Sequence, residues 1–191
     1  MDYCDEIFDK LLEIHDPECL KEVREAATVK TFTKKDVMLH AGEVQEEIPF
    51  IISGSFWGYY VDDAGKICTD CITDIVGCPV TASSDIQGFL SPSDVCFEAL
   101  EDSEVYCVPT PVVIHIIQTY PEVVTAMSKI IHIAFTYHRR FQYINTLPLQ
   151  QRYDELCKLF PAVTSRLSRT QLAAILNVSL PALSRALGEK Q

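Results

Sequence analysis

LSRTQLAAILNVSLPALSRAL, residues 167–187, has the pattern of two short helices around a tight turn. Ser168 and Ser179 stand where helix N-caps are expected, and Pro181 follows the second cap, where the missing N–H of proline costs nothing. Asn177 occupies the turn, which requires a residue that tolerates the left-handed backbone conformation. The stretch therefore predicts a helix-turn-helix, although a helical hairpin that only packs within its own domain would have the same pattern.

The charge of the chain is unevenly distributed. The formal net charge is -11 overall, yet residues 139–191 contain eight Lys and Arg against three Asp and Glu, a net of +5. Residues 1–138 contain eight basic and 24 acidic side chains, a net of -16. This asymmetry predicts that the basic end, which includes the two helices, binds a polyanion.

The spacing of apolar residues changes twice along the chain. Residues 5–14 and the stretch that follows Asp16 fit two short helices, whereas residues 28–110 contain short β-rich runs separated by turns. Among these runs, YVDDAGKIC at residues 60–68 is the clearest β-hairpin signal. The chain is therefore expected to belong to the α+β class.

A long helix is predicted over residues 119–147. Its apolar residues are separated by alternating steps of four and three, which is the spacing of a seam between two paired helices. The seam residues are Val123, Met127, Ile130, Ala134, Tyr137, Phe141 and Ile144. The seam predicts a homodimer with two-fold symmetry, while packing of the same stripe on the chain's own domain remains the alternative.

The N-terminus and the cysteines bear on the cellular compartment. The first ten residues are acidic, and no apolar run approaches the roughly 18 residues that a membrane helix needs. We therefore expect a cytoplasmic protein that does not contact a membrane. Its eight cysteines are expected to be reduced, because disulfide scaffolds are usually short secreted chains.

Three segments give the chain a resemblance to the Crp/Fnr superfamily of bacterial transcription regulators. They are KKDVMLHAGEVQEEIPFIISGSFWGYYVDDAGK at 34–66, FEALEDSEV at 97–105 and SRTQLAAILNVSLPALSRAL at 168–187. In the first segment, Gly42, Gly54 and Gly65 fall like the turn glycines of the family's β-roll.

The resemblance implies a specific organisation of the chain. We expect N-terminal helices and a cyclic-nucleotide-binding-like, double-stranded β-roll of jelly-roll type over residues 1–118, which acts as the sensor. A dimerisation helix over 119–147 and an all-α helix-turn-helix domain over 148–191 follow. Only four residues follow Leu187, so the β-hairpin wing of the family is expected to be reduced or missing.

The resemblance also implies site residues. Phosphate contacts map onto Arg169, Thr170 and Ser179, and a base-reading arginine maps onto Arg185. The complete expected DNA contact set is Ser168, Arg169, Thr170, Ser179, Leu180, Ala182, Ser184 and Arg185. The expected effector pocket between the β-roll and the long helix is formed by Val76, Cys78, Phe89, Phe97, Met127, Ile131 and Phe135.

The sequence departs from the family where a cyclic phosphate would bind. Cyclic-nucleotide binders have a Gly-Glu pair and an Arg followed by Ser or Thr, whereas this chain has Gly77-Cys78 and Ser93-Asp94. Because an aspartate repels a phosphate, cyclic AMP and cyclic GMP are not the expected effectors. The expected signal is an uncharged or weakly polar small molecule, or a redox change.

Other chemistries receive less support from the sequence. The CTDC motif at 68–71 lies in a predicted strand, where residues three apart point to opposite faces and do not form a metal knuckle. An N-terminal iron-sulfur cysteine cluster is absent, and His132 and His138 are a weak basis for haem ligation. No nucleophile elbow or phosphate loop indicates an enzyme, so no cofactor is expected.

Three classes of function follow. The first is a dimeric transcription regulator that binds promoter operator DNA, responds to an effector and has RNA polymerase as a further partner. The second is a sensor that does not bind DNA and uses a degenerate helix-turn-helix to dock another protein. The third is a thiol-based redox switch without an organic ligand.

Overall fold

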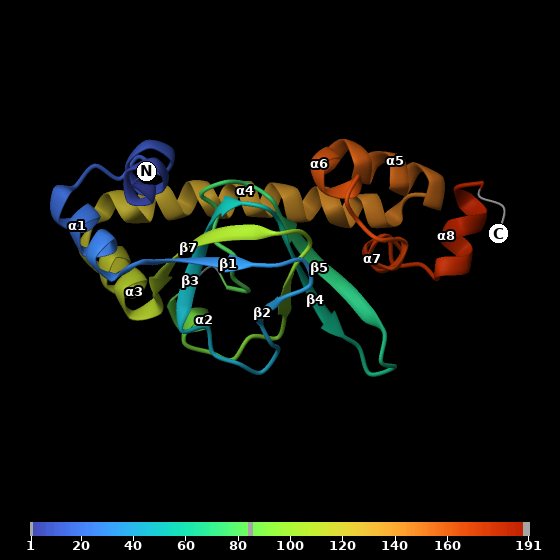
Figure 1. The fold of residues 1–191 in the computed structure, drawn as a ribbon, viewed down its shortest axis with the longest axis horizontal. Helices are drawn as coiled ribbons and strands as arrows, with labels where there is room; N and C mark the ends of the chain where they lie inside the picture. The colour runs from blue at the N-terminus through green and yellow to red at the C-terminus, as the bar shows by residue number, and fades with distance from the viewer. Residues whose placement is uncertain (1, 84–85, 189–191) are drawn as a thin grey trace.

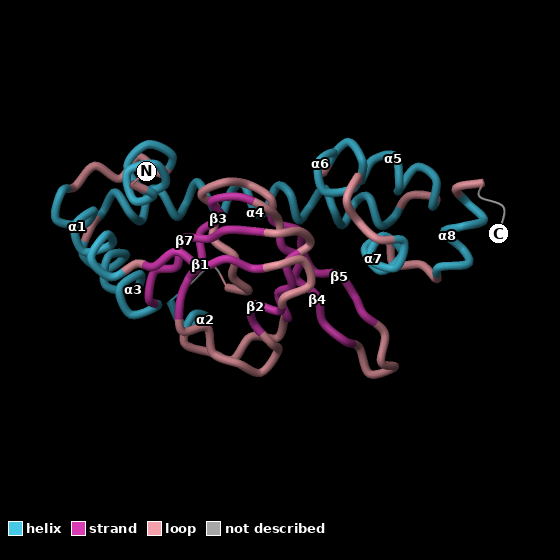
Figure 2. Tube along the Cα trace, viewed as in Figure 1, coloured by secondary structure: helices cyan, strands magenta, loops and turns pink. Residues whose placement is uncertain are grey.

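The computed structural model describes residues 2–83 and 86–188, which form a β-roll with helices at both ends. Figure 1 shows the N-terminal helices at one end, the strands in the middle, and the C-terminal helices at the other end, with α4 (Pro121–Thr146) running along all three. Figure 2 shows the same division, with strands confined to the centre of the molecule. The α+β class expected from the sequence is confirmed.

The β-roll consists of two antiparallel sheets packed against each other. The first sheet has the order β1-β7-β3, and its strands are β1 (Thr28–Phe32), β7 (Ser103–Pro109) and β3 (Glu47–Ser53). The second has the order β2-β6-β4-β5, and its strands are β2 (Val37–Leu39), β6 (Cys96–Ala99), β4 (Phe56–Val61) and β5 (Ile67–Thr73). A short helix, α2 (Ile86–Phe89), precedes β6. Alternating side chains such as Ile51, Phe56 and Phe97 fill the space between the sheets.

The expected turn glycines have the backbone conformation that their positions require. Gly42, Gly54 and Gly65 have φ of +89°, +91° and +78°. At Gly54, between β3 and β4, Ser103 occupies the space that a Cβ would need. Gly65 closes the predicted hairpin between β4 and β5, where its N–H donates to the Asp62 carbonyl at 2.9 Å. Glycine is therefore needed at the turns that give the β-roll its path.

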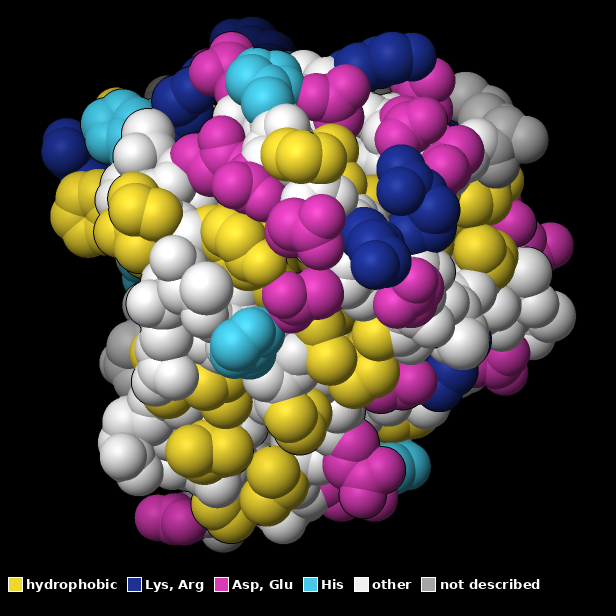
Figure 3. Space-filling model, turned by 90° about the vertical axis from the view of Figure 1, so that its left-hand side faces the viewer, with side chains coloured by type: hydrophobic (Ala, Val, Ile, Leu, Met, Phe, Trp, Pro, Cys, Tyr) yellow, Lys and Arg dark blue, Asp and Glu magenta, His cyan; other side chains and the backbone are white. Residues whose placement is uncertain are grey.

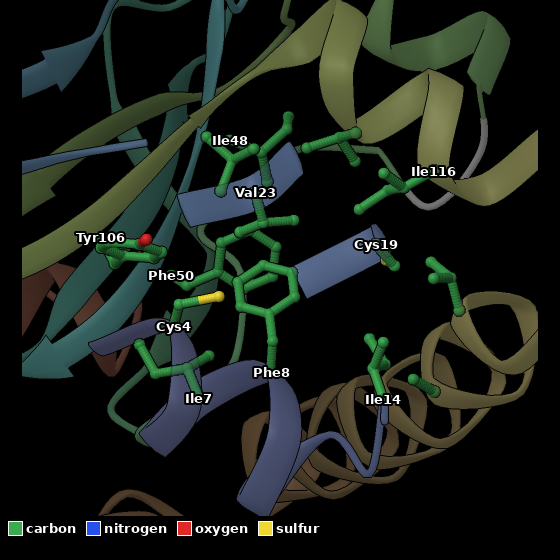
Figure 4. Packing of buried hydrophobic residues seen from close by; sticks show 14 of the residues in the cluster. Cys4, Ile7, Phe8, Ile14, Cys19, Val23, Ile48, Phe50, Tyr106 and Ile116 are labelled. Carbon is green, nitrogen blue, oxygen red and sulfur yellow. The ribbon is translucent and has the colours of Figure 1, made fainter. Parts of the chain in front are cut away.

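The N-terminal helices close one end of the β-roll. They are η1 (Asp5–Leu11), which is a π-helix, and α1 (Pro17–Ala26), which Asp16 caps as predicted by accepting from the Glu18 and Cys19 N–H groups. Their apolar side chains pack with those of β3, β7, α3 (Thr110–Thr119) and the start of α4. Figure 4 shows this cluster, in which the rings of Phe8 and Phe50 are 4.9 Å apart.

The long helix α4 confirms the predicted helix over 119–147 but uses its apolar stripe differently. Val123 packs in the N-terminal cluster, Phe141 packs in the C-terminal one, and Ile130 and Ile144 are also buried. Met127, Ala134 and Tyr137 line a cavity between α4 and the β-roll. Six of the seven residues expected in the dimer seam are therefore covered at least partly by the chain's own domains, whereas Ala134 is exposed. None of the helices within the described residues combines the length and the apolarity of a membrane span.

The C-terminal region contains the predicted helix-turn-helix. Its helices are α5 (Leu149–Leu159), α6 (Pro161–Thr164), α7 (Arg169–Ile175) and α8 (Leu180–Ala186). Ser168 forms a capping box with Gln171 at the start of α7, and Ser179 accepts from the Ala182 N–H at the start of α8. Asn177 has φ of +57°, as the turn requires. The expected shortening of the wing concerns residues 189–191, which lie outside the described residues.

Leu183 is the inward-facing anchor of α8, with no exposed surface. We expect Leu183→Ala to lower the free energy of unfolding by about 2–5 kcal/mol, because it leaves a cavity that the two helices cannot close. Urea denaturation followed by circular dichroism measures the change. Leu180→Ala, at a residue that is 43% exposed, is the matched control and should change stability by less than about 0.5 kcal/mol. Equal losses in both variants would contradict this packing.

Candidate nucleic-acid interface and effector cavity

The second helix of the helix-turn-helix presents an exposed surface. α8 packs on α5 and α7 through its buried side, and Figure 1 places it at the end of the molecule opposite the N-terminus. Leu180, Pro181 and Arg185 are exposed on the other side. The Arg185 Nε donates to the Pro181 carbonyl at 3.4 Å, so the guanidinium stays on the exposed side of α8. This helix has the exposure that insertion into a major groove requires.

The other residues expected to contact DNA lie at or near the first turns of α7 and α8. Thr170 is exposed at the first turn of α7, and Ser168 and Ser179 are exposed but already accept backbone N–H groups as caps. Arg169, Ala182 and Ser184 are only partly exposed. The structure thus brings the expected residues to one end of the molecule, and Arg185 is the most accessible cation among them.

The helix-turn-helix docks on the β-roll through α7 rather than α8, a contact that the sequence analysis missed. α7 packs against β5. Trp57 of β4, Ile72 of β5 and Leu100 belong to one buried cluster with Leu172 and Ala173 of α7. The first helix is therefore buried on both its faces, while the second remains free for a partner.

Polar contacts surround this docking interface. Arg166 forms an ion pair with Glu101, and the Arg166 carbonyl accepts from the Lys34 Nζ at 2.7 Å. At the tip of the β4–β5 hairpin, Lys66 donates to the side chain of Asn177 in the turn between α7 and α8. These contacts join residues that are 65 or more positions apart in the chain, so no local sequence pattern indicates them.

Glu98 carries a perturbed charge at the same interface. It lies on β6, paired with Trp57 of β4, and its burial raises the pKa of the carboxyl above the ordinary value. The nearby Gln171 amide of α7 and the Lys35 ammonium act in the opposite direction. The ionised carboxylate is therefore disfavoured where the two domains meet.

A cavity of about 330 Å³ lies between the β-roll and α4. Four of the expected effector residues line it, namely Cys78, Met127, Ile131 and Phe135. The rest of its wall is formed by side chains that the sequence analysis did not assign to the pocket: Asp70, Cys71, Ile72, Thr73, Ile75, Pro79, Thr81, Ala82, Ser83, Ile130, Ile133, Ala134, Tyr137, His138, Phe141 and Phe160. The position of the cavity between the β-roll and the long helix agrees with the prediction, but most of its lining was not predicted.

Three expected effector residues do not line the cavity and are corrected. Val76 is 50% exposed on the surface. Phe89 packs in the N-terminal cluster, and Phe97 packs between the two sheets. Both rings are almost fully buried because each fills the interior of a core, where large apolar side chains are most stable.

The residues that replace the family's phosphate-binding pairs do not form an anion site. Cys78 lines the cavity, whereas neither Ser93 nor Asp94 does. Ser93 is buried beside Gly42, with its hydroxyl donating to the Val95 carbonyl at 2.7 Å, and Asp94 is exposed. The two pairs thus lie in different places, and neither contributes a cation.

All eight cysteines are free thiols. Burial raises the pKa of Cys4 to about 11 and that of Cys19 to about 12. Thiols with such pKa values stay protonated at neutral pH, which makes them poor nucleophiles. Among the described residues, no group of three or more His, Cys, Asp and Glu side chains has the arrangement of a metal site. His132 and His138 are both exposed on α4.

Comparisons with known proteins identify the fold. No protein-family model matches the sequence, and no curated protein is significantly similar to it in sequence. Solved structures do match. CLP of Xanthomonas campestris, a c-di-GMP-responsive global regulator, has a TM-score of 0.74 at 14% identity, over 91% of this chain and 90% of that chain.

Two further structures match over most of their length. FixK2 of Bradyrhizobium japonicum has a TM-score of 0.66 at 16% identity, over 85% of this chain and 83% of that chain. A CRP-family transcriptional regulator of Thermus thermophilus has a TM-score of 0.69 at 14% identity, over 83% of this chain and 82% of that chain. The chain therefore has the Crp/Fnr fold, a β-roll followed by a long helix and a helical C-terminal region.

The partly buried carboxyl group of Glu98 predicts a pH-dependent stability. The pKa of this carboxyl is higher in the folded protein than in the unfolded chain. At a pH above the folded-state pKa, the ionised carboxylate therefore lowers the stability of the folded protein. This loss of stability disappears as the pH falls below the pKa of a glutamate in the unfolded chain. Glu98→Gln should therefore raise the thermal midpoint at neutral pH, and the difference from wild type should shrink toward about pH 4.

Thermal unfolding measured across this pH range tests the prediction. The matched control is Glu46→Gln, at an exposed glutamate in the loop before β3, which should follow the wild-type curve. A stabilisation by Glu98→Gln that does not depend on pH would be evidence against a partly buried environment that disfavours the charged carboxylate at this position.

Proposed function

We propose that the protein is a dimeric, DNA-binding transcription regulator controlled by a ligand in the cavity between the β-roll and α4. The observation that carries this proposal is the exposed α8, which stands free of the β-roll while α7 is buried on it. The Crp/Fnr fold and the description of the similar structures as regulators support the same function. Promoter DNA is the proposed partner.

The charge distribution supports DNA binding at one end of the molecule. The net charge of residues 139–191 is +5, whereas residues 1–138 have a net charge of -16. Figure 3 views the N-terminal end, where acidic side chains are spread widely over the surface. A duplex approaching this protein is repelled by the β-roll end and attracted to the helix-turn-helix end, so the net acidity does not oppose the proposed function.

Arg185 and Arg169 are expected to contribute differently to DNA binding. Selection from a random duplex library gives a preferred sequence, and fluorescence anisotropy then measures affinity over a range of salt concentrations. Arg185→Ala should cost about 1–3 kcal/mol on the preferred sequence and relax the preference at one position, because this side chain reads a base edge. Arg169→Ala should weaken binding to preferred and random duplexes alike.

Lys129→Ala provides the control for these variants, because Lys129 lies on α4 and pairs with Glu13 of the N-terminal region, away from the helix-turn-helix. It should leave both affinities unchanged. Selection that enriches no sequence, together with no binding at low salt, would refute the regulator and favour a sensor that docks another protein.

A second apolar line on α4 supports a homodimer. Val124, Ile131 and Phe135 are separated by seven and four positions, so they lie on one side of the helix, apart from the buried stripe. They are 49%, 39% and 58% exposed, and Ile131 and Phe135 also line the cavity. Exposed apolar side chains in line along a helix are typical of an interface between paired helices. We assign the dimer contact to this line in place of the seam that the sequence indicated.

Replacing Ile131 and Phe135 by glutamate should therefore convert a dimer into a monomer, since the variant places like charges opposite each other across the two-fold axis. Sedimentation velocity measures the oligomeric state. Tyr143→Glu is the matched control, because Tyr143 is 60% exposed on a different side of α4. A double variant that sediments like wild type would rule out this face as the interface.

A further inference from the structure

The cavity lies where three parts of the chain meet. β5 and residues 75–83 form one wall, α4 forms the second, and Phe160 closes it from the helix-turn-helix region. The rings of Tyr137 on α4 and Phe160 are 5.8 Å apart. We propose that this cavity binds a mainly apolar small molecule without negative charge, in direct contact with Phe160. Its role as the effector rests on the proposed function, but its binding does not.

The size and composition of the cavity fit an organic ligand. Its volume of about 330 Å³ is within the range of small-molecule sites. Ile, Phe, Met, Ala and Pro side chains dominate the wall, and a few polar groups from Asp70, Thr73, Thr81 and His138 interrupt them. An apolar body with one or two polar groups is complementary to this lining.

The charge of the lining determines which ligands are excluded. The described lining residues contain no Lys or Arg, and Asp70 is their one carboxylate. An anion in this cavity would lose its hydration without gaining a permanently charged cation as a partner, and Asp70 would repel it. A neutral molecule avoids this cost, and a cationic amine would gain an ion pair with Asp70. The cavity therefore selects against phosphates, nucleotides and carboxylates.

Phe160 connects the cavity to the DNA-binding end. This side chain is 1% exposed and belongs to the same buried cluster as Trp57 and Leu172, which form the docking interface between the β-roll and α7. A ligand that packs on Phe160 therefore contacts the core that holds the helix-turn-helix in place. If the helix-turn-helix has two arrangements and the ligand contacts Phe160 differently in each, the ligand binds one arrangement more tightly. Ligand binding then increases the population of that arrangement.

A pair of related dyes tests the site and its charge preference. N-phenylnaphthylamine is neutral, and anilinonaphthalene sulfonate has the same aromatic body with one negative charge. We expect saturable fluorescence enhancement by the neutral dye in the wild-type protein, with at least about tenfold weaker binding of the sulfonate. Asp70→Asn should reduce the difference in affinity between the two dyes, because it removes the carboxylate that repels the sulfonate.

Two α4 variants locate the dye. Ala134 lines the cavity and is exposed, so Ala134→Phe fills part of the cavity without disturbing a buried core. This variant should bind the neutral dye about tenfold more weakly than wild type. Thr136 is exposed on α4 and does not line the cavity, so Thr136→Phe should bind like wild type. Near-ultraviolet circular dichroism verifies that both variants are folded.

Two results would overturn the proposal: sulfonate binding as tight as that of the neutral dye, or unchanged dye binding in Ala134→Phe. The second result would place the dye outside this cavity. A separate measurement adds saturating neutral dye to the DNA-binding assay, where the affinity should change in wild type and not in Ala134→Phe. Dye binding that follows the predictions while DNA binding fails would refute the regulator and leave the ligand site intact.

Discussion

The burial of one face of α4 in two separate clusters is the constraint on which the rest of the structure depends. Val123 and Ala126 pack with the N-terminal helices, and Phe141 packs with the helix-turn-helix. A helix of 26 residues spans about 39 Å, so a single rigid element joins the two ends of the molecule. Because its helical stability comes from this packing, any change in either cluster acts on the same helix.

The docking of the helix-turn-helix on the β-roll depends mainly on apolar packing. The ion pair of Arg166 with Glu101 and the contact of Lys66 with Asn177 involve exposed lysine and arginine side chains, and such contacts contribute about 0–1 kcal/mol each. The buried contact of Trp57 and Ile72 with Leu172 is the larger part of the interface. A domain held by one small apolar contact and weak polar ones is suited to moving as a unit.

Features fixed by neighbours in the sequence could be predicted, whereas contacts between distant segments could not. The caps at Ser168 and Ser179 and the turn at Asn177 depend on a few consecutive residues, and all three have the predicted form. The spacing of Val123 to Ile144 correctly indicated an apolar face but did not reveal which surface covers it. The same applies to Phe89 and Phe97, since an apolar ring fits a core and a pocket lining equally well.

The hairpin between β4 and β5 connects the charge pattern to the proposed control of DNA binding. Lys66 at its tip bonds to Asn177, so the turn that contains Asp62 and Asp63 lies beside the turn of the helix-turn-helix. In a regulator, carboxylates at this place raise the free energy of bringing a phosphate backbone close. Under the proposed function, docking and DNA binding would oppose each other through charge, and Phe160 would couple docking to the cavity. Undocking of the helix-turn-helix would then relieve this repulsion, and a ligand in the cavity would change the free energy of the apolar packing that is lost on undocking.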